Sequence, residues 1–331
     1  MKILIAGGAG FIGSNLSTYF IDHGHQVTII DSLITGQESN IKHLSNNRNF
    51  RFIKDDICSF DFKTLQTFNL IYHLASPASP IQYKKHPIAT LRANSLGTEK
   101  LIEFTKTSNS DIFVFASTSE IYGDPLEHPQ KESYWGNVNP VGPRACYDEA
   151  KRFGEALLIN YQREFNLDIR VARIFNTYGP NMEKDDGRVV SNFIMQALIN
   201  KPITIYGTGQ QTRSFCYVND MVEALVKLGT IPDLTGQIIN LGNPNEITIK
   251  KLAEIIKYMI KSSAPIVEKA IDADDPKMRK PDISKANKLL SWQPKIKLET
   301  GLQKTIEYFR TEIVLLRGSP NVSFGTTKQS R

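Results

Sequence analysis

Short apolar runs alternate with stretches of helical periodicity through the first half of the chain. Each run has four or five residues and predicts a buried strand of a parallel sheet; the runs are 2–6, 26–30, 50–53, 70–74, 112–116 and 169–173. Apolar residues at helical spacing predict helices over 12–23, 88–107 and 148–163. Strands that alternate with helices predict an α/β fold of the Rossmann type, whose doubly wound parallel sheet binds its ligand at the carboxyl edge of the strands.

Three glycines, Gly7, Gly10 and Gly13, lie between the first predicted strand and the first predicted helix. The first permits a tight turn, the second lets the backbone approach a pyrophosphate, and the third permits close packing of helix on strand. The free N–H groups at the helix N-terminus attract the anion. The pattern predicts a bound dinucleotide, and the alternative is a purely structural turn.

Asp31 ends the second predicted strand. Its carboxylate would bond the hydroxyls of an adenine ribose and would repel a 2′-phosphate, so NAD is favoured over NADP. The alternative is an aspartate that only caps the turn.

The character of the chain changes after about residue 177, where loops rich in Gly, Pro and Asp separate shorter elements. We expect residues 1–177 to form mainly the NAD-binding Rossmann domain. Residues 178–316 should form mainly a smaller substrate-binding lobe that is interleaved with the first domain. The polar, turn-rich stretch 317–331 is expected to be a disordered tail.

Composition excludes several classes of function. The chain has 331 residues and a net charge of +6, but it has no long run of Lys and Arg, so we expect no nucleic-acid partner. The three cysteines form no CxxC pair and the six histidines lack metal-ligand spacing, which predicts neither a disulfide framework nor a metal site. Because we find no leader and no apolar run of about 18 residues, we expect no membrane contact and a cytoplasmic location.

Tyr147 and Lys151 stand four residues apart at the start of a predicted helix. Four residues are about one helical turn, so both side chains lie on one face. A nearby ammonium group stabilises a phenolate, and we therefore expect a lowered pKa that makes Tyr147 a useful base.

Hydroxyls and a carboxylate follow the strand predicted over 112–116, in the order Ser117, Thr118, Ser119 and Glu120. That position is the ligand-binding edge of a doubly wound sheet. A helix N-cap, in which Ser or Thr is followed by Glu, explains this segment by itself equally well.

Longer motifs indicate a family. They are HLASPASP at 73–80, STSEIYGDP at 117–125, RACYDEAKR at 144–152, ARIFNTYGP at 172–180, DGRVVSNF at 186–193 and QTRSF at 211–215. With the glycine loop and the Tyr147–Lys151 pair, the chain resembles the extended short-chain dehydrogenase/reductase family from residue 2 to about residue 309. Within that family the motifs resemble those of the UDP-glucuronate decarboxylases, also called UDP-xylose synthases.

One position separates these enzymes from their relatives. The related dTDP-glucose 4,6-dehydratases carry Thr-Asp-Glu where this chain has Thr118, Ser119 and Glu120, and their Asp acts as acid for the departing hydroxyl. Because serine is a poor proton donor, the resemblance favours decarboxylation over loss of water. The 4-epimerases lack the Ser-Pro-Ala-Ser-Pro stretch found here at 76–80.

The resemblance implies a reaction at the sugar. Tyr147 would take the proton of the 4-hydroxyl while hydride passes from C4 to NAD, Lys151 would stabilise the phenolate, and Thr118 would bond the 4-oxygen. The β-keto acid so formed would lose carbon dioxide, and hydride would return to C4 to give UDP-xylose. Ser119 and Glu120 would lie near the sugar carboxylate, where Glu120 would disfavour its ionised form or orient a water.

The resemblance also implies binding residues. Arg279 would bind at the carboxylate end, and Arg188 and Arg213 would contact uridine and diphosphate because the planar guanidinium suits phosphate. UDP-glucuronate would be held by Pro80, Tyr83, Thr118, Glu120, Asn176, Arg188, Tyr206, Arg213 and Arg279. NAD would be held by Gly7, Gly10, Phe11, Ile12, Gly13, Asp31, Ser32, Thr35, Gly36, Asp56, Ile57, Leu74, Ala75, Ser76, Asn94, Ser117, Tyr147, Lys151, Thr177 and Arg188.

Other interpretations stay open. The same scaffold supports other UDP-sugar conversions, such as 4-epimerisation or a synthase that also makes apiose, and a non-catalytic NAD-binding regulator is a third possibility. The family usually dimerises through two helices per subunit, here those near 88–107 and 148–163, so a homodimer is expected. His73, Trp135 and Trp292 are expected to be packing residues.

Overall fold

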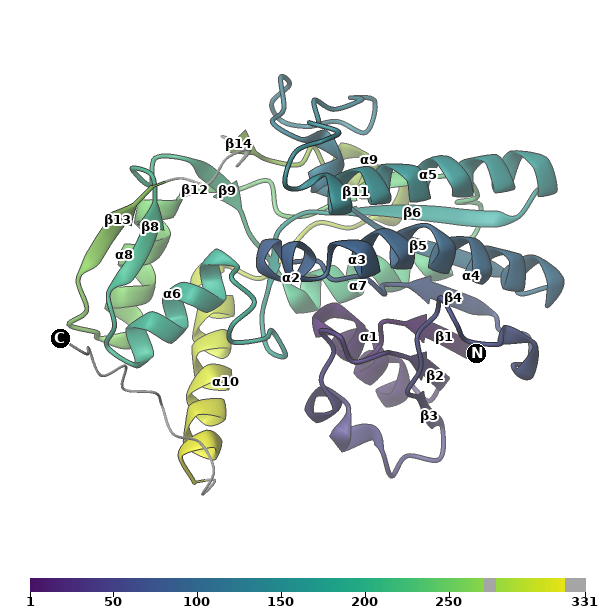
Figure 1. The fold of residues 1–331 in the computed structure, drawn as a ribbon, viewed down its shortest axis with the longest axis horizontal. Coiled ribbons are helices and arrows are strands. Elements are labelled where there is room, and N and C mark those ends of the chain that lie inside the picture. The colour runs from purple at the N-terminus through teal and green to yellow at the C-terminus, as the bar shows by residue number, and fades with distance from the viewer. Residues whose placement is uncertain (271–277, 319–331) are drawn as a thin grey trace.

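The computed structural model describes residues 1–270 and 278–318 and is built around one seven-stranded sheet. Neighbouring strands pair in parallel throughout, in the order β11-β6-β5-β4-β1-β2-β3. The strands are β1 (Lys2–Ala6), β2 (Gln26–Ile30), β3 (Phe50–Ile53), β4 (Leu70–His73), β5 (Ile112–Thr118), β6 (Asp168–Ile174) and β11 (Ile238–Leu241) (Figure 1). The predicted doubly wound α/β fold is confirmed.

Alternate residues of the central strands face opposite sides of the sheet, because side chains along a strand alternate in direction. In β1, Ile3 and Ile5 belong to one fully buried cluster, while Leu4 and Ala6 belong to a second. Both faces of the strand are thus apolar, as the unbroken hydrophobic run predicts for a parallel strand covered on both sides.

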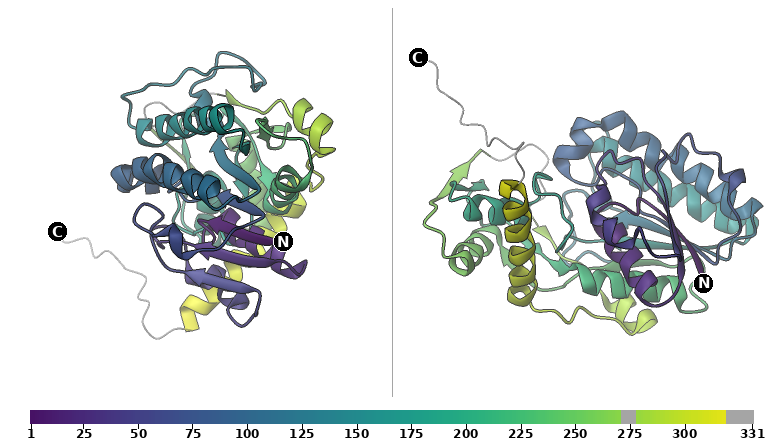
Figure 2. Two further views of the ribbon diagram at one scale, coloured as in Figure 1. Left: turned by 90° about the vertical axis from the view of Figure 1, so that its right-hand side faces the viewer. Right: turned by 90° about the horizontal axis from the view of Figure 1, so that it is seen from below.

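Helices cover both faces of the sheet (Figure 2, left). One layer contains α4 (Leu96–Thr107) and α5 (Ala145–Phe165), with α3 (Pro87–Asn94) packed on α5; the other contains α1 (Phe11–Asp22) and α7 (Val218–Thr230). The single helix predicted over 88–107 is wrong in one respect. It is interrupted at Ser95, whose backbone (φ −110°, ψ −83°) leaves the helical region and separates α3 from α4.

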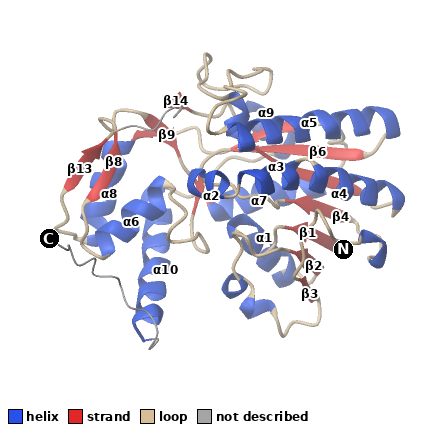
Figure 3. Cartoon of the chain, in the orientation of Figure 1, coloured by secondary structure: helices blue, strands red, loops and turns tan. Residues whose placement is uncertain are grey.

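A smaller lobe follows β6 along the chain (Figure 3). Its helices are α6 (Val189–Leu198), α8 (Ile249–Ile260) and α10 (Leu298–Gly318), and its strands are β8 (Ile203–Tyr206), β9 (Thr212–Ser214), β12 (Glu246–Thr248), β13 (Ile266–Lys269) and β14 (Met278–Arg279). β8 pairs with β13, and β9 pairs with both β12 and β14. The chain also returns to the large sheet, through α7, β11 and α9 (Ser284–Leu290). The division at residue 177 stays a prediction.

Short elements complete the described chain. They are α2 (Pro80–Lys85), the two-stranded pair β7 (Thr177–Tyr178) and β10 (Cys216–Tyr217), and the 3-10 helices η1 (Glu38–Asn40), η2 (Lys42–Leu44), η3 (Phe62–Thr64) and η4 (Ser119–Tyr122). Of the predicted tail, 317 and 318 belong to α10, and 319–331 lie outside the described residues.

The tryptophan expectation is half right. Trp292 is 1% exposed, and its indole N–H donates to the carbonyl of Asp220 at 3.0 Å. Trp135 is 88% exposed, so its assignment as a packing residue is wrong. It lies in the long connection between η4 and α5, where its backbone carbonyl accepts a hydrogen bond from Arg152 at 2.7 Å. His73 is fully buried and bonds Thr98, as expected for a packing residue.

Within the described ranges, no helix has the length and apolar character needed to cross a membrane. The same ranges contain no group of three or more His, Cys, Asp and Glu side chains placed to hold a metal ion.

Candidate active site

A cleft of about 430 Å³ lies where the carboxyl edge of the sheet meets the smaller lobe. The sheet side contributes the ends of β1, β4, β5 and β6, and the lobe contributes residues of α6, β8, β9 and β14. The sheet order reverses at β1, since β2 lies on one side of it and β4 on the other. Ligands of doubly wound folds bind at this reversal, and the volume suits a nucleotide-sized ligand.

The glycine loop joins β1 to α1 at this reversal. Gly7 has φ +82°, and a Cβ atom there would stand 2.6 Å from the backbone nitrogen of Ala75. At Gly13 a Cβ would stand 2.1 Å from the carbonyl oxygen of Gly7, which forces the loop and helix apart. Both positions require glycine, and the resulting turn leaves the N-terminus of α1 open to the cleft.

Asp31 follows β2 and is 8% exposed. Its carboxylate accepts the N–H groups of Ala9 and Leu33, each at 2.9 Å. Burial raises the pKa of Asp31, and these backbone N–H groups oppose the rise. The residue also lines a smaller recess that continues from the cleft, together with Ser32, Thr35, Gly36, Asp56 and Ile57. Asp31 therefore holds the loop and also faces the recess, so the two interpretations of this residue are compatible.

Most of the predicted cofactor residues gather here. The cleft is lined by Gly7, Gly10, Phe11, Ile12, Gly13, Thr35, Leu74, Ser76, Ser117, Tyr147, Lys151, Thr177 and Arg188. The recess adds Asp31, Ser32, Gly36, Asp56, Ile57 and Ala75. Asn94 lines neither space. It is fully buried and donates to the Ser76 hydroxyl at 2.8 Å, so it supports a wall residue.

Tyr147 and Lys151 both line the cleft from the first two turns of α5. The Lys151 ammonium donates to the carbonyl of Ala116 at 2.5 Å and lies 5.9 Å from the centre of the Tyr147 ring. The helix starts here because the segment 145–165 carries its buried residues on one face, against β5 and β6.

The expected lowering of the pKa of Tyr147 is not found. Burial raises this pKa above its ordinary value, and a hydrogen bond with the Thr118 side chain is the largest opposing influence. The physical reason is that burial disfavours the charged phenolate, and the carboxylates of Glu120 and Asp148 disfavour it further, while the ammonium of Lys151 donates to the carbonyl of Ala116.

Glu120 lies between two arginines. One carboxylate oxygen accepts from Arg144, just before α5, and the other accepts from Arg279 in β14. Although burial alone would raise it, these two cations hold the pKa of Glu120 low, at about 2. Thr118 caps the segment, because its hydroxyl accepts the backbone N–H of Glu120 at 3.2 Å. The capping interpretation is thus correct and leaves the carboxylate in the cleft.

One predicted substrate residue, Tyr83, lies off the cleft wall, and one residue with no predicted role, Arg144, lies on it. Tyr83 is 1% exposed and is absent from the cleft wall; it stacks behind Tyr147, with ring centres 5.1 Å apart and planes within 5°. The expected direct contact of Tyr83 with the sugar is therefore not provided by this geometry. Arg144 lines the cleft beside Glu120 and was given no role from the sequence, although its position one turn before Tyr147 placed it on the same side of α5.

The remaining substrate residues lie on the wall of the cleft: Pro80, Thr118, Ser119, Glu120, Asn176, Arg188, Tyr206, Arg213 and Arg279. Arg188 forms a 2.6 Å ion pair with Asp186, and its guanidinium lies 5.4 Å from the ring centre of Phe11. Arg213 is 8% exposed. Arg188 is the N-cap residue of α6, and Arg213 belongs to β9. Both cations therefore lie on the side of the cleft opposite the glycine loop.

Comparison with known proteins identifies the class. The model of the NAD dependent epimerase/dehydratase family matches residues 3–242, and the chain belongs to this family. Among solved structures, the UDP-glucose 4-epimerase of Thermotoga maritima with UDP-glucose has a TM-score of 0.85 at 30% identity, covering 95% of this chain and 100% of that one. The UDP-glucuronic acid 4-epimerase of Bacillus cereus, in complex with UDP-glucuronic acid and NAD, has a TM-score of 0.85 at 31% identity, covering 94% and 100%.

Curated relatives are more similar in sequence. UDP-glucuronic acid decarboxylase 1 of Arabidopsis thaliana is 50% identical over 314 residues, which is 95% of this chain and 71% of that protein. UDP-glucuronic acid decarboxylase 1 of Xenopus tropicalis is 48% identical over 312 residues, 94% of this chain and 73% of that protein. UDP-glucuronic acid decarboxylase 3 of Arabidopsis thaliana is 49% identical over 314 residues and is covered over 90% of its length. The resemblance to this group is confirmed.

Proposed function

We propose that this chain converts UDP-glucuronate to UDP-xylose and carbon dioxide, with NAD as a cofactor that is reduced and reoxidised within one cycle. The names of relatives at 46–50% identity support this activity. The site offers a base at the sheet edge, a glycine cradle that suits a dinucleotide, and a charged cluster placed for a sugar acid.

The observation that carries the proposal is the pair of cations beside Tyr147. Arg144 and Arg279 both bond the single carboxylate of Glu120 at this end of the cleft. Burial and the neighbouring carboxylate of Glu120 raise the pKa of Asp148, which lies behind them. A uronate carboxylate would bring an anion to this arginine-rich end, which suits guanidinium groups, whereas a neutral hexose carries no such charge.

The chain's own residues account for the proton transfer at the 4-oxygen of the sugar. Tyr147, whose hydroxyl bonds Thr118, is placed to take the proton of the sugar 4-hydroxyl. Lys151 would compensate the phenolate charge from the same helix face. When bound, NAD would accept hydride from C4 and later return it. The 4-keto sugar acid is a β-keto acid, so its C5–carboxylate bond breaks with the electron pair passing to the carbonyl, and C5 is then protonated.

Ser119 separates this reaction from elimination. Its hydroxyl is 2% exposed and stands at the position where a dehydratase needs an acid. A serine does not protonate a departing hydroxyl effectively, whereas loss of carbon dioxide needs no such acid. Glu120 is held as a carboxylate by its two arginines. It would therefore position these arginines at the sugar end of the cleft and would not donate a proton.

The direct test is incubation of the purified protein with UDP-glucuronate, without added NAD, followed by nucleotide-sugar chromatography and measurement of carbon dioxide. We expect UDP-xylose and carbon dioxide in equal amounts. The names of the similar solved structures make 4-epimerisation the second candidate, and it gives UDP-galacturonate with no carbon dioxide. That product pattern would overturn the proposal.

We also propose a homodimer formed through α3 and α5. These helices pack side by side and carry large apolar side chains in the open: Ile88 is 60% exposed and Phe153 is 50% exposed. We expect light scattering to give twice the chain mass. Phe153→Glu should shift the protein to the monomer mass, and an unchanged dimer would move the interface elsewhere.

A further inference from the structure

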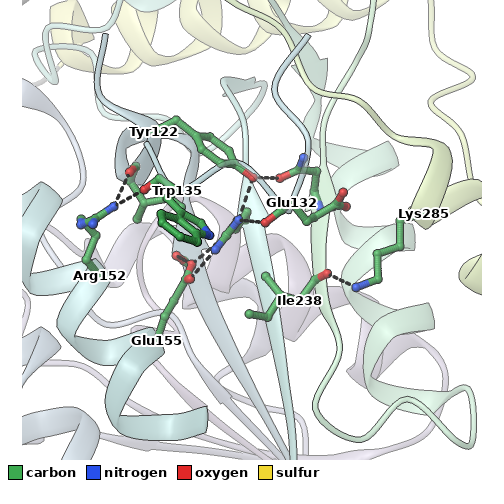
Figure 4. Close-up of polar contacts among 11 residues, drawn as sticks. Tyr122, Glu132, Trp135, Arg152, Glu155, Ile238 and Lys285 are labelled. Atoms are coloured by element: carbon green, nitrogen blue, oxygen red, sulfur yellow. Dashed lines mark hydrogen bonds and ion pairs between the residues drawn. The ribbon is translucent and has the colours of Figure 1, made fainter. Parts of the chain in front are cut away.

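A buried ion pair between Glu155 and Arg173 lies outside the cleft wall, next to Ser117, which lines it. Figure 4 shows Glu155 with Tyr122 and Glu132 of the same network. The Glu155 carboxylate accepts from the Ser117 hydroxyl at 2.5 Å and from Nε and Nη2 of Arg173 at 3.0 and 2.8 Å. Both charged residues are 8% exposed. Charges so deeply buried are costly unless they are fully paired, which this geometry achieves.

The opposite side of Arg173 holds the far end of the active-site segment. Its Nη1 donates to the Tyr122 hydroxyl and to the Glu132 carbonyl, each at 2.9 Å. The Tyr122 hydroxyl donates in turn to Asn240 in β11 at 2.8 Å. The network therefore anchors residues 117 and 122, which flank the three residues that face the sugar end of the cleft.

Glu155 also stands one turn after Lys151 on α5, so their side chains are neighbours. Lys151 is 2% exposed. The titratable groups that face it are Tyr147 and Glu155 on its own helix and His73 from β4, with Arg173 of β6 beyond Glu155. Burial lowers the pKa of Lys151 to about 7, and the Glu155 carboxylate opposes this change. Burial likewise lowers the pKa of His73 to about 3, so His73 is neutral.

We propose that Glu155, fixed by its bonds to Arg173 and Ser117, is a positioning residue whose carboxylate supports the ammonium form of Lys151 one helical turn away. Through Ser117 the same carboxylate fixes the end of β5, and through Arg173 it fixes the start of the loop after η4. The consequence of Glu155 for catalysis rests on the proposed function, in which the Lys151 ammonium compensates the charge of the Tyr147 phenolate. An uncharged Lys151 cannot do so. The effect on the charge of Lys151 does not depend on the substrate.

The sharpest test measures Lys151 directly in the full chain without ligands. The protein is labelled with ¹³C at the lysine ε-carbons, and the Lys151 resonance is identified by its absence from Lys151→Met. The chemical shift is then followed from pH 5 to pH 10 in the wild type and in Glu155→Gln. An opposite charge within about 4–6 Å shifts a pKa by about 1–3 units, so for a carboxylate one helical turn away we expect the midpoint to fall by about one unit. An unchanged midpoint would overturn the proposal.

Asp168→Asn is the matched control. Asp168 pairs with the 1% exposed Arg170 at 2.6 Å on the same strand as Arg173, but Arg170 contacts α7 on the opposite face of the sheet. This substitution removes a carboxylate from a buried arginine without approaching Lys151. We expect thermal stability to fall as in Glu155→Gln while the Lys151 midpoint stays at the wild-type value. Equal midpoint shifts in both variants would mean general loosening of the core and would overturn the proposal.

A double variant provides a second test in case Glu155→Gln alone fails to fold. Glu155→Gln combined with Arg173→Met removes both charges, which buried cores often tolerate. The midpoint should still fall, by less than in the single variant, since an opposing cation has also gone.

The pH profile of kcat supplies the catalytic readout. Activity that needs the ammonium is lost as pH rises through the Lys151 pKa, so a lower pKa moves the alkaline limb to lower pH by the same amount. A shifted NMR midpoint with no decarboxylation in the wild type would contradict the proposed function and leave the ion-pair inference standing. A shifted NMR midpoint with an unmoved alkaline limb would overturn the catalytic part of the inference.

Discussion

The two ends of the cleft are built from different parts of the polypeptide. At the dinucleotide end the contacts come from backbone, in a loop that spans residues 7–13 of one strand–helix turn. At the sugar end they come from charged side chains, and Glu120 meets Arg279 across 159 residues of sequence. A site built from backbone groups needs only one correctly formed turn. A site built from side chains of both lobes forms only when the two lobes are packed against each other. We infer that the first end would set the class of cofactor that is held and that the second would set which sugar reacts.

The largest effect should come from the group that stands between the two ends. Tyr147→Phe removes the only oxygen able to take the 4-hydroxyl proton from this face of α5, so we expect kcat to fall about 10³-fold or more. Dinucleotide affinity should change less than about threefold, because the glycine loop is untouched. Both are measured with UDP-glucuronate turnover and a fluorescence titration with NADH. Near-normal turnover would remove Tyr147 from the mechanism.

Arg279→Met breaks the sugar end alone. It leaves Glu120 with one cation and removes the contribution of β14 to the cluster. Truncating one member of a buried charge pair typically costs about 2–5 kcal/mol, so we expect kcat/KM for UDP-glucuronate to fall about 10²-fold. Affinity for UDP alone should hold, as measured by calorimetry. Equal loss for UDP and for the sugar acid would show that the substitution had disturbed the whole lobe.

Gly13→Ala breaks the dinucleotide end alone. The new Cβ would stand 2.1 Å from the carbonyl oxygen of Gly7, and the loop must move to admit it. Overpacking of this kind costs about 1–3 kcal/mol, so we expect NADH affinity to fall about tenfold and the melting temperature to drop by a few degrees. Ala78→Gly is a useful comparison, since it also changes one methyl group on the cleft wall without entering the glycine turn. Unaltered NADH binding in Gly13→Ala would place the dinucleotide elsewhere.

Asp31→Asn should give the smallest change. The amide retains an acceptor for one of the two backbone N–H groups, so the loop should keep its shape. Loss of the negative charge removes the repulsion of a 2′-phosphate. The dissociation constant for NADP divided by that for NAD should therefore fall by about three- to tenfold, which corresponds to at most ~1.4 kcal/mol in binding free energy. The ratio of the two dissociation constants is the measurement. A ratio equal to that of the wild type would assign Asp31 to loop structure only.

The sequence predicts the backbone end of the site better than the side-chain end, for a physical reason. Apolar runs and the spacing of Gly7 and Gly13 are local signals, and the structure has six of the seven strands of the sheet, α1 and α5 within a few residues of the predicted bounds, whereas β11 was not predicted. The interruption at Ser95 carries no such signal. Trp135 was misplaced because an aromatic side chain in a loop is buried only if another segment covers it, and none of the described segments does.

The side-chain end depends on tertiary neighbours that a linear pattern does not display. Tyr83 lies in a motif adjacent to the site, yet it packs behind Tyr147 and not on the wall. Burial raises the pKa of Tyr147, so the direction of that shift could not be obtained from the four-residue spacing to Lys151. Arg144 was within the quoted motif, but its partner Glu120 became evident only when η4 and α5 were placed together.

The position of β11 bears on how the protein is made. β6 lies between β5 and β11 in the sheet, so its outer edge is unpaired until the ribosome has added residues 238–241. An open strand edge is a template for pairing with other chains. During translation, therefore, the edge of β6 stays open while the segment containing α6 and α7 is synthesised. Once Ile238–Leu241 pairs with β6, the edge strand on this side has four residues in place of seven, and a shorter edge offers less backbone for pairing with other chains.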